Sequence, residues 1–251
     1  IFSQFIRDAT FNFCCRIEII HLMTAIILDT ETHTLNGLPI EIAYAPVEVH
    51  AGKLSLDKSQ LFDQLYQVNQ PISYAAMAVH HILESDLVDQ PLYTSFELPA
   101  DTTYIIGHNV DYDMAAIARC GVETQDIKAI CTLALARKVW PQADAHNISA
   151  LIYLISKGSD KARELLKGAH RADADIILTA NILMHIVHHL NIHNIDDLYL
   201  ASEQARIPTK INFGKHKGSL IQDLPHDYIN WLLRQDDLDP YLKKALEKTL
   251  V

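Results

Sequence analysis

The stretch that decides the fold is Ala25-Ile26-Ile27-Leu28-Asp29-Thr30-Glu31, an apolar run that ends in two acids. A run of this length, followed by polar residues, is typical of a buried strand. Successive side chains of a strand point to opposite faces, so Asp29 and Glu31 leave the same face. In sheets with crossover helices, active sites lie at the edge where such strands end. We therefore expect both carboxylates at a functional edge of the sheet.

Other segments extend this strand into an α/β fold. Further strands are expected at Ile40–Val49, within Leu61–Val68 and at Tyr104–Gly107. The clearest helix runs from about Ala172 to Leu190, because apolar residues recur there at spacings of four and three. Shorter helices are expected at residues 75–81, 111–120, 131–139, 148–155 and 160–167. The pattern predicts a mixed central sheet of about five strands flanked by helices.

Composition and charge exclude several classes of protein. The chain has 251 residues, 49% of them hydrophobic, and a formal net charge of −10. No run approaches the roughly 20 apolar residues that span a bilayer. The four cysteines form neither a Cys-x-x-Cys pair nor a dense disulfide framework. We expect a cytoplasmic protein with reduced thiols and no membrane contact. The negative charge argues against a protein that coats long stretches of nucleic acid, because it repels phosphates. It argues less strongly against an enzyme that holds only one chain end.

Three regions are expected along the chain. Residues 1–22 form an N-terminal extension to which no function is assigned, and residues 23–196 form the main domain. A boundary between Asp196 and Ile211 separates it from a small C-terminal module, residues 206–251. Within this module, the stretch Arg206–Ser219 holds four cations and no acid. It is interpreted either as a nucleic-acid contact or as a solvated loop, and the sequence leaves both open.

Two later segments carry acids in a context that agrees with the first strand. The segment from His108 to Asp113 follows an expected strand and places an acid inside a new helix. The segment from His170 to Asp175 enters the long helix. Carboxylates aimed at one point repel each other unless a cation lies between them. Oxygen ligands of this kind favour Mg²⁺ or Mn²⁺ over zinc, so the segments together predict a metal site.

The three segments resemble the motifs of the DnaQ-like superfamily of 3′→5′ exonucleases, in its subgroup with a catalytic histidine. The resemblance implies a ribonuclease H-like fold. It implies that Asp29, Glu31, Asp113 and Asp175 hold two Mg²⁺ ions, for which Mn²⁺ substitutes, and that His170 takes the proton from the attacking water. The implied activity is release of nucleoside 5′-monophosphates from DNA 3′ ends, in DNA repair or recombination.

The resemblance also implies where the substrate lies. The expected partner is a single-stranded or frayed DNA 3′ end, and its contacts are assigned to residues near the acids, namely Thr30, Thr32, His33, His80 and Asn109. Thr32 and His33 are placed to sense a 2′-hydroxyl. Helix packing by His80 and helix capping by Asn109 stay open as alternatives. Trimming of RNA ends by the same fold is the alternative activity, and a non-catalytic module that binds nucleic-acid ends is a further one.

Further stretches extend the resemblance beyond the three motifs. Pro71-Ile72-Ser73, Cys131-Thr132 and Phe213–Gly218 all resemble one member of the superfamily. The additional acid Asp111 departs from the shared pattern, and neither it nor Asp173 is assigned to the metals.

Some conspicuous residues receive ordinary structural interpretations. Three histidines are expected on the last long helix at spacings of four, namely His185, His189 and His193. This spacing can suit zinc, but no carboxylate completes a zinc motif there, so a solvated helix face is favoured. Trp140 and Trp231 are interpreted as core anchors rather than as platforms for stacked bases.

Overall fold

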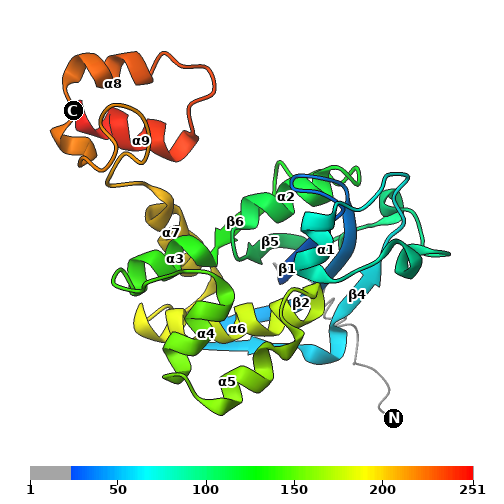
Figure 1. The fold of residues 1–251 in the computed structure, drawn as a ribbon. Coiled ribbons are helices and arrows are strands. Elements are labelled where there is room, and N and C mark those ends of the chain that lie inside the picture. The colour runs from blue at the N-terminus through cyan, green and yellow to red at the C-terminus, as the bar shows by residue number, and fades with distance from the viewer. Residues whose placement is uncertain (1–23, 251) are drawn as a thin grey trace, which may run out of the picture.

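The computed structural model describes residues 24–250, in which a domain built on a sheet is followed by a smaller helical module (Figure 1). The extension expected for residues 1–22 lies outside the described residues. The described sheet has six strands, close to the expected five. They are β1 (Thr24–Thr32), β2 (Pro39–His50), β3 (Lys53–Leu56), β4 (Phe62–Leu65), β5 (Thr102–Gly107) and β6 (Lys128–Cys131). The fold class is thus the predicted mixed α/β class.

Strand β1 lies in the middle of the sheet. The strand order is β3-β2-β1-β5-β6, with β4 paired to β2 beside this path. β1 runs antiparallel to β2, where Glu31 lies opposite Glu41, and parallel to β5. β5 in turn runs parallel to β6. The C-terminal ends of β1 and β5 therefore meet at one edge of the sheet, where the first two acidic segments lie.

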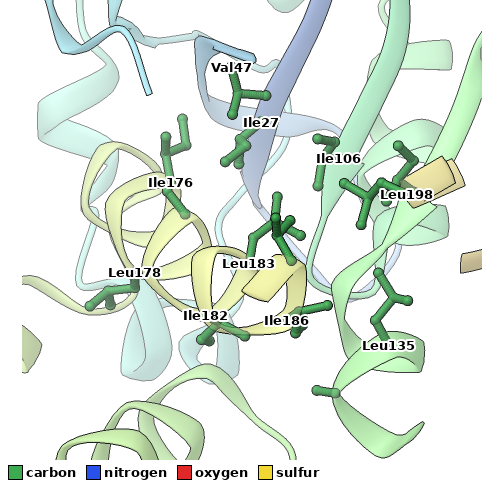
Figure 2. Close-up of a cluster of buried hydrophobic side chains, with 14 of the residues drawn as sticks. Ile27, Val47, Ile106, Leu135, Ile176, Leu178, Ile182, Leu183, Ile186 and Leu198 are labelled. Atoms are coloured by element: carbon green, nitrogen blue, oxygen red, sulfur yellow. The ribbon is translucent and has the colours of Figure 1, made fainter. Parts of the chain in front are cut away.

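Side chains of β1 alternate between two cores, as the period of a strand requires. Ile27 packs into one core with helix α6 (Ala172–His189), and Leu28 packs into the core on the other face. Figure 2 shows the first core, in which Ile27 and Ile106 from the strands face Ile176 and Leu183 of α6. Full burial of such a side chain contributes about 1.5–3 kcal/mol. These contacts fix α6 across the sheet and so fix the acids at its first turn.

The predicted helices of the sheet domain agree with the structure to within two residues at each end. Cys131 was expected to be the first residue of a helix, but it is the last residue of β6 and pairs with Gly107. The helices other than α6 are α1 (Tyr74–His80), α2 (Val110–Ala118), α3 (Thr132–Val139), α4 (Ile148–Ser156), α5 (Asp160–Leu165), α7 (Ile195–Arg206), α8 (His226–Leu232) and α9 (Pro240–Thr249). Among the described residues, no helix is long and apolar enough to cross a membrane.

Helix α7 occupies much of the stretch where the sequence predicts a domain boundary. It packs against α3 and β6 of the sheet domain, and α8 and α9 lie beyond it, apart from the sheet (Figure 1). The C-terminal module has its own buried core, formed by Ile211, Ile221, Leu224, Ile229, Leu232, Leu242, Ala245 and Leu246. Arg206, the last residue of α7, forms an ion pair with Asp111 of α2 and donates a hydrogen bond of 2.6 Å to Tyr241 of α9. This arginine therefore joins the module to the sheet domain.

Candidate active site

Three carboxylates converge at the end of β1. Asp29 and Glu31 belong to β1, and Asp175 reaches them from the first turn of α6. One oxygen from each of the three lies within 4.8 Å of the other two. Ile176, the neighbour of Asp175, is fully buried in the core beneath α6. The packing that holds α6 on the sheet therefore also directs Asp175 to the cluster.

The fourth predicted acid, Asp113, is buried beside this cluster and held by β1 and β5. Thr30 lies between the two acids of β1, and its hydroxyl donates to Asp113 Oδ1 at 2.9 Å. Gly107 ends β5, and a Cβ atom there would lie 3.0 Å from Asp113 Oδ2 and 3.2 Å from the Cα of Val110. A glycine is thus needed for α2 to approach so closely. Asp113 lines the same cavity as the other three acids.

Burial, together with repulsion from nearby acids, raises the pKa values of all four acids. Burial, followed by the charges of Asp113 and Asp175, raises the pKa of Asp29 well above its ordinary value. Burial and then the charge of Asp175 raise the pKa of Glu31 to about 8. Burial raises the pKa of Asp113 to about 7 and that of Asp175 to about 6. Without a cation, the site therefore resists carrying four negative charges at neutral pH.

The chemistry of this donor set fits divalent metal ions. Its members are all carboxylate oxygens, which are the ligands that hard divalent cations take in proteins. A cation placed among Asp29, Glu31 and Asp175 would reverse the repulsion that raises their pKa values. The carboxylate cluster can therefore hold a metal, with Asp113 beside it.

His170 stands at the opening of the same cavity. It lies in the turn before α6 with a φ of 68°, and its N–H donates to Asp175 Oδ1 at 3.3 Å. The residue is exposed, and it lines a cavity of about 520 Å³ together with the four acids. An imidazole so placed can exchange protons with solvent and reach a water bound near the carboxylates.

An ion pair between the buried Glu41 and the partly exposed Arg171 fixes the turn that carries His170. Arg171 donates to Oε1 of Glu41 from Nε at 2.8 Å and from Nη2 at 2.5 Å. Oε2 of Glu41 accepts the N–H of Ala172 at 3.0 Å, at the start of α6. Glu41 is fully buried on β2, directly opposite Glu31. Sequence reasoning missed this pair, because Glu41 stands among apolar residues of an expected strand and 130 positions from its partner.

The cavity includes further residues that the motifs did not single out. Tyr112, Asn147 and Ser149 line it together with the acids. The hydroxyl of Tyr112 is hydrogen-bonded to that of Thr32, and Tyr112 also lines a second cavity, of about 290 Å³. It therefore stands between the two cavities. The available signal was its place directly before Asp113 in the second motif.

Four of the five residues predicted to contact substrate line these cavities, and His33 does not. Asn109 is exposed in the acid-lined cavity, and its side chain makes no capping hydrogen bond to α2, so the capping interpretation is not supported. Thr32 and His80 line the second cavity. His80 is buried, and its Nδ1 accepts the N–H of Ile82 at 3.0 Å, which limits its movement.

The side chains of Thr30 and His33 form hydrogen bonds with other residues of the protein. His33 is buried and lies outside both cavities: its Nδ1 accepts the N–H of Leu38 at 2.8 Å and its Nε2 lies 3.0 Å from Oε1 of Gln70. Its ring is held by the loop after β1. Thr30 lines the acid cavity, but its hydroxyl is directed at Asp113.

The remaining acids and histidines do not join the site. Asp111 forms its ion pair with Arg206, away from the cluster. His185 and His189 are exposed on α6, and His193 lies beyond the end of that helix. The regular helical spacing that would suit zinc is therefore not realised. Among the described residues, the cluster at the end of β1 is the one group of histidines, cysteines and acids arranged to hold a metal.

A mixed sheet whose central strand ends in paired acids, faced by acids from two helices, defines a nuclease of the exonuclease class. The chain belongs to the exonuclease family, whose model, described as "Exonuclease", matches residues 26–183. A second model, described as "Putative quorum-sensing-regulated virulence factor", matches residues 204–248 in the C-terminal module.

Particular relatives agree with this class. The chain is 29% identical to exodeoxyribonuclease 10 of Escherichia coli K12 over 230 residues, which cover 89% of this chain and 97% of the relative. The same values hold for the protein of that name from Escherichia coli O6:H1. The predicted likeness to one superfamily member, now identified as this enzyme (exodeoxyribonuclease X), is thereby confirmed.

Solved structures confirm the ribonuclease H-like fold. The structure titled "Exonuclease X in complex with 5′ overhanging duplex DNA" is 27% identical, with a TM-score of 0.54, over 71% of this chain and 99% of that chain. Escherichia coli exonuclease I bound to a dT13 oligonucleotide is 15% identical, with a TM-score of 0.50, over 65% of this chain and 41% of that chain, which shows the fold alone.

Proposed function

We propose that the protein is a 3′→5′ exodeoxyribonuclease that releases nucleoside 5′-monophosphates by two-metal-ion hydrolysis, in DNA repair or recombination. The observation that carries the proposal is the cluster of Asp29, Glu31 and Asp175 in one cavity with Asp113 and His170. The curated relative is named an exodeoxyribonuclease, and a similar solved structure holds DNA. Both support DNA as the substrate.

Each residue has a separate role in this proposal. Asp29, Glu31 and Asp175 hold Mg²⁺, or Mn²⁺ in its place, and Asp113 completes the site. When bound, two such ions stabilise the charge that develops on the attacking and leaving oxygens. His170 takes the proton of the attacking water at its imidazole and passes it to solvent, since its ring is exposed. Thr30 acts indirectly, by holding Asp113.

The terminal nucleotide occupies the second cavity in this proposal. That cavity shares Glu31 and Tyr112 with the acid-lined one, and it is otherwise formed mainly by small and apolar residues of α1 and of the loop after β1. An apolar cavity with a few polar groups suits a base and a sugar. Thr32 and His80 are then the polar contacts in this cavity, and the exposed Asn109 contacts the substrate from the acid-lined one. Thr32 stands where it can distinguish a deoxyribose from a ribose.

The test compares matched DNA and RNA strands labelled at the 5′ end, incubated with the protein and Mg²⁺. Asp175→Asn removes one charge of the cluster, and Asp173→Asn removes one from the same helical turn outside it. We expect DNA to shorten from its 3′ end with wild type and Asp173→Asn, and to stay intact with Asp175→Asn or EDTA. Shortening of RNA alone would assign the same site to RNA ends. Binding without cleavage of either strand would refute the enzymatic proposal.

A further inference from the structure

A loop of the C-terminal module, Phe213 to Gly218, has a fixed shape and is here called the lysine loop. At its base, Ile211 and Ser219 are joined by a backbone hydrogen bond of 3.1 Å, and Gly218 donates to the carbonyl of Ile211 at 2.7 Å. Gly214 and Gly218 have φ values of 65° and 90°, a region that favours glycine. These constraints hold the side chains between the two glycines in one arrangement.

Three rings form a row that joins the lysine loop to α8: His216 belongs to the loop, and Tyr228 and Trp231 belong to the helix. The ring centroids of His216 and Tyr228 lie 4.5 Å apart, and those of Tyr228 and Trp231 lie 5.6 Å apart with an interplanar angle of 24°. A Cβ atom on Gly214 would lie 2.8 Å from the hydroxyl of Tyr228, so the loop lies directly against this row. The row thus connects α8 to the loop.

Trp231 is the exposed end of the row, which corrects its interpretation as a core anchor. It is 52% exposed and is not part of the core that α8 and α9 enclose. Phe213, the first residue of the lysine loop, is 42% exposed. Exposed rings of this size offer faces on which a planar group of a ligand can stack.

The charge of this module differs from that of the rest of the chain. Residues 206–251 carry eight Lys and Arg against six Asp and Glu, a formal charge of +2, and the preceding residues carry −12. Lys215 and Lys217 are both exposed on the lysine loop. Neither takes part in an ion pair within the part of the chain that the structure describes. Their charges are therefore free to meet an external anion.

We infer that the lysine loop and the row of rings form a second binding surface for a nucleic-acid strand, distinct from the active site. Lys215 and Lys217 meet its phosphates, and a base stacks on Trp231. Alternating cations and exposed rings are the combination that binds single strands without reading their sequence. The negative charge of the sheet domain would repel a strand, so this surface supplies attraction that the rest of the chain lacks.

Arg206 gives this surface a fixed relation to the active site. Its guanidinium contacts Asp111 of α2 and Tyr241 of α9, and α2 also carries Tyr112 and Asp113 of the acid-lined cavity. The same strand can therefore be held by the module while its 3′ end enters the cavity. This arrangement rests on the proposed function, whereas binding by the module can be measured without any cleavage.

The test measures binding by fluorescence anisotropy with the full chain in EDTA, using labelled oligo-dT of about 20 and about 4 nucleotides. The variants are Lys215→Ala with Lys217→Ala, and Trp231→Leu. The matched control is Lys243→Ala with Lys244→Ala, which removes two exposed lysines from α9 of the same module. The variant Lys215→Arg with Lys217→Arg retains both charges, and Trp231→Phe retains a ring. These conservative variants distinguish a loss of contacts to the strand from a loss of folding.

We expect Trp231→Leu to weaken binding of the long strand about tenfold, the loss of one stacked base. The double lysine variant should lower the slope of log Kd against log salt by about 1.4, since two phosphate contacts to a single strand are lost. The short strand, the control and the conservative variants should bind as wild type. Unchanged binding of the long strand in both test variants would overturn the inference. A surface that binds a protein instead of a nucleic acid would give this same result. Release of mononucleotides from the short strand in Mg²⁺ tests the active site separately.

Discussion

Replacing Arg171 with methionine removes the cation that accompanies the fully buried carboxylate of Glu41. That carboxylate lies beside the cluster, and Arg171 contacts it through two nitrogens. The substitution keeps most of the volume of the side chain but leaves a negative charge buried among other acids. Glu41 also accepts the N–H of Ala172, so the disturbance falls on the start of α6, which carries Asp175.

The expected loss in the free energy of unfolding follows from how deeply each partner of the ion pair is buried. Removing one partner of a buried ion pair costs about 3–5 kcal/mol, because the other charge remains without compensation. Here the Glu41 side chain is 0% exposed and that of Arg171 is 44% exposed. Solvent reaches the arginine and weakens the interaction, so we expect a loss of about 2–3 kcal/mol in the free energy of unfolding. Glu41→Gln together with Arg171→Met should be less destabilising than the sum of the single changes.

Urea unfolding followed by circular dichroism measures these values in the absence of metal. The matched control is Arg163→Met, which removes an ion pair of 2.7 Å to Asp160 whose side chains are 66% and 90% exposed. That change should cost less than about 1 kcal/mol. If Arg171→Met and Arg163→Met are equally mild, or if the Glu41 and Arg171 changes are simply additive, the ion pair between Glu41 and Arg171 does not hold the start of α6 in place.

Three further predictions concern the acids themselves. The pKa of Glu31 is raised from 4.5 to about 8 and that of Asp113 from 3.8 to about 7, so the fold binds these protons more tightly than the unfolded chain does. In EDTA, the melting temperature should therefore fall as the pH rises through this window, and Mg²⁺ should restore it near pH 8. A flat profile would contradict the raised pKa values that burial and repulsion give these acids. Thr30→Val should cost about 1 kcal/mol and lower kcat by freeing Asp113, as steady-state kinetics and urea unfolding together would show. Gly107→Ala should displace Asp113 and reduce activity, and full activity in a folded variant would show that the close approach of α2 is unimportant.

Local patterns predicted the parts of the fold whose signal lies within one segment. The apolar run before Asp29 and the helical stripe of α6 were both identified, because each shows its own periodicity. The short strands β3 and β6 were not expected. Each has four residues, and each is a strand because a distant or neighbouring strand pairs with it.

The same distinction applies to the site. The order of the acidic motifs predicted which carboxylates share the cavity, since each motif stands at a strand end or a helix start. Non-local contacts were not predictable: the support of α6 by Glu41 and the position of Tyr112 between two cavities depend on how β2 and α2 pack. The hydrogen bonds of His33 were not predictable for the same reason, since its partners lie in the following loop and near α1.

The most direct test of the central claim identifies the first product released from a DNA strand. The strand carries radioactive phosphorus at its last internucleotide phosphate, and chromatography follows the label in Mg²⁺ with wild type and His170→Gln. We predict that wild type releases the label at once as a nucleoside 5′-monophosphate, and that His170→Gln, with its fold intact, releases it far more slowly. Release of unlabelled nucleotides first, or of internal fragments, would contradict a 3′→5′ exonuclease at this site.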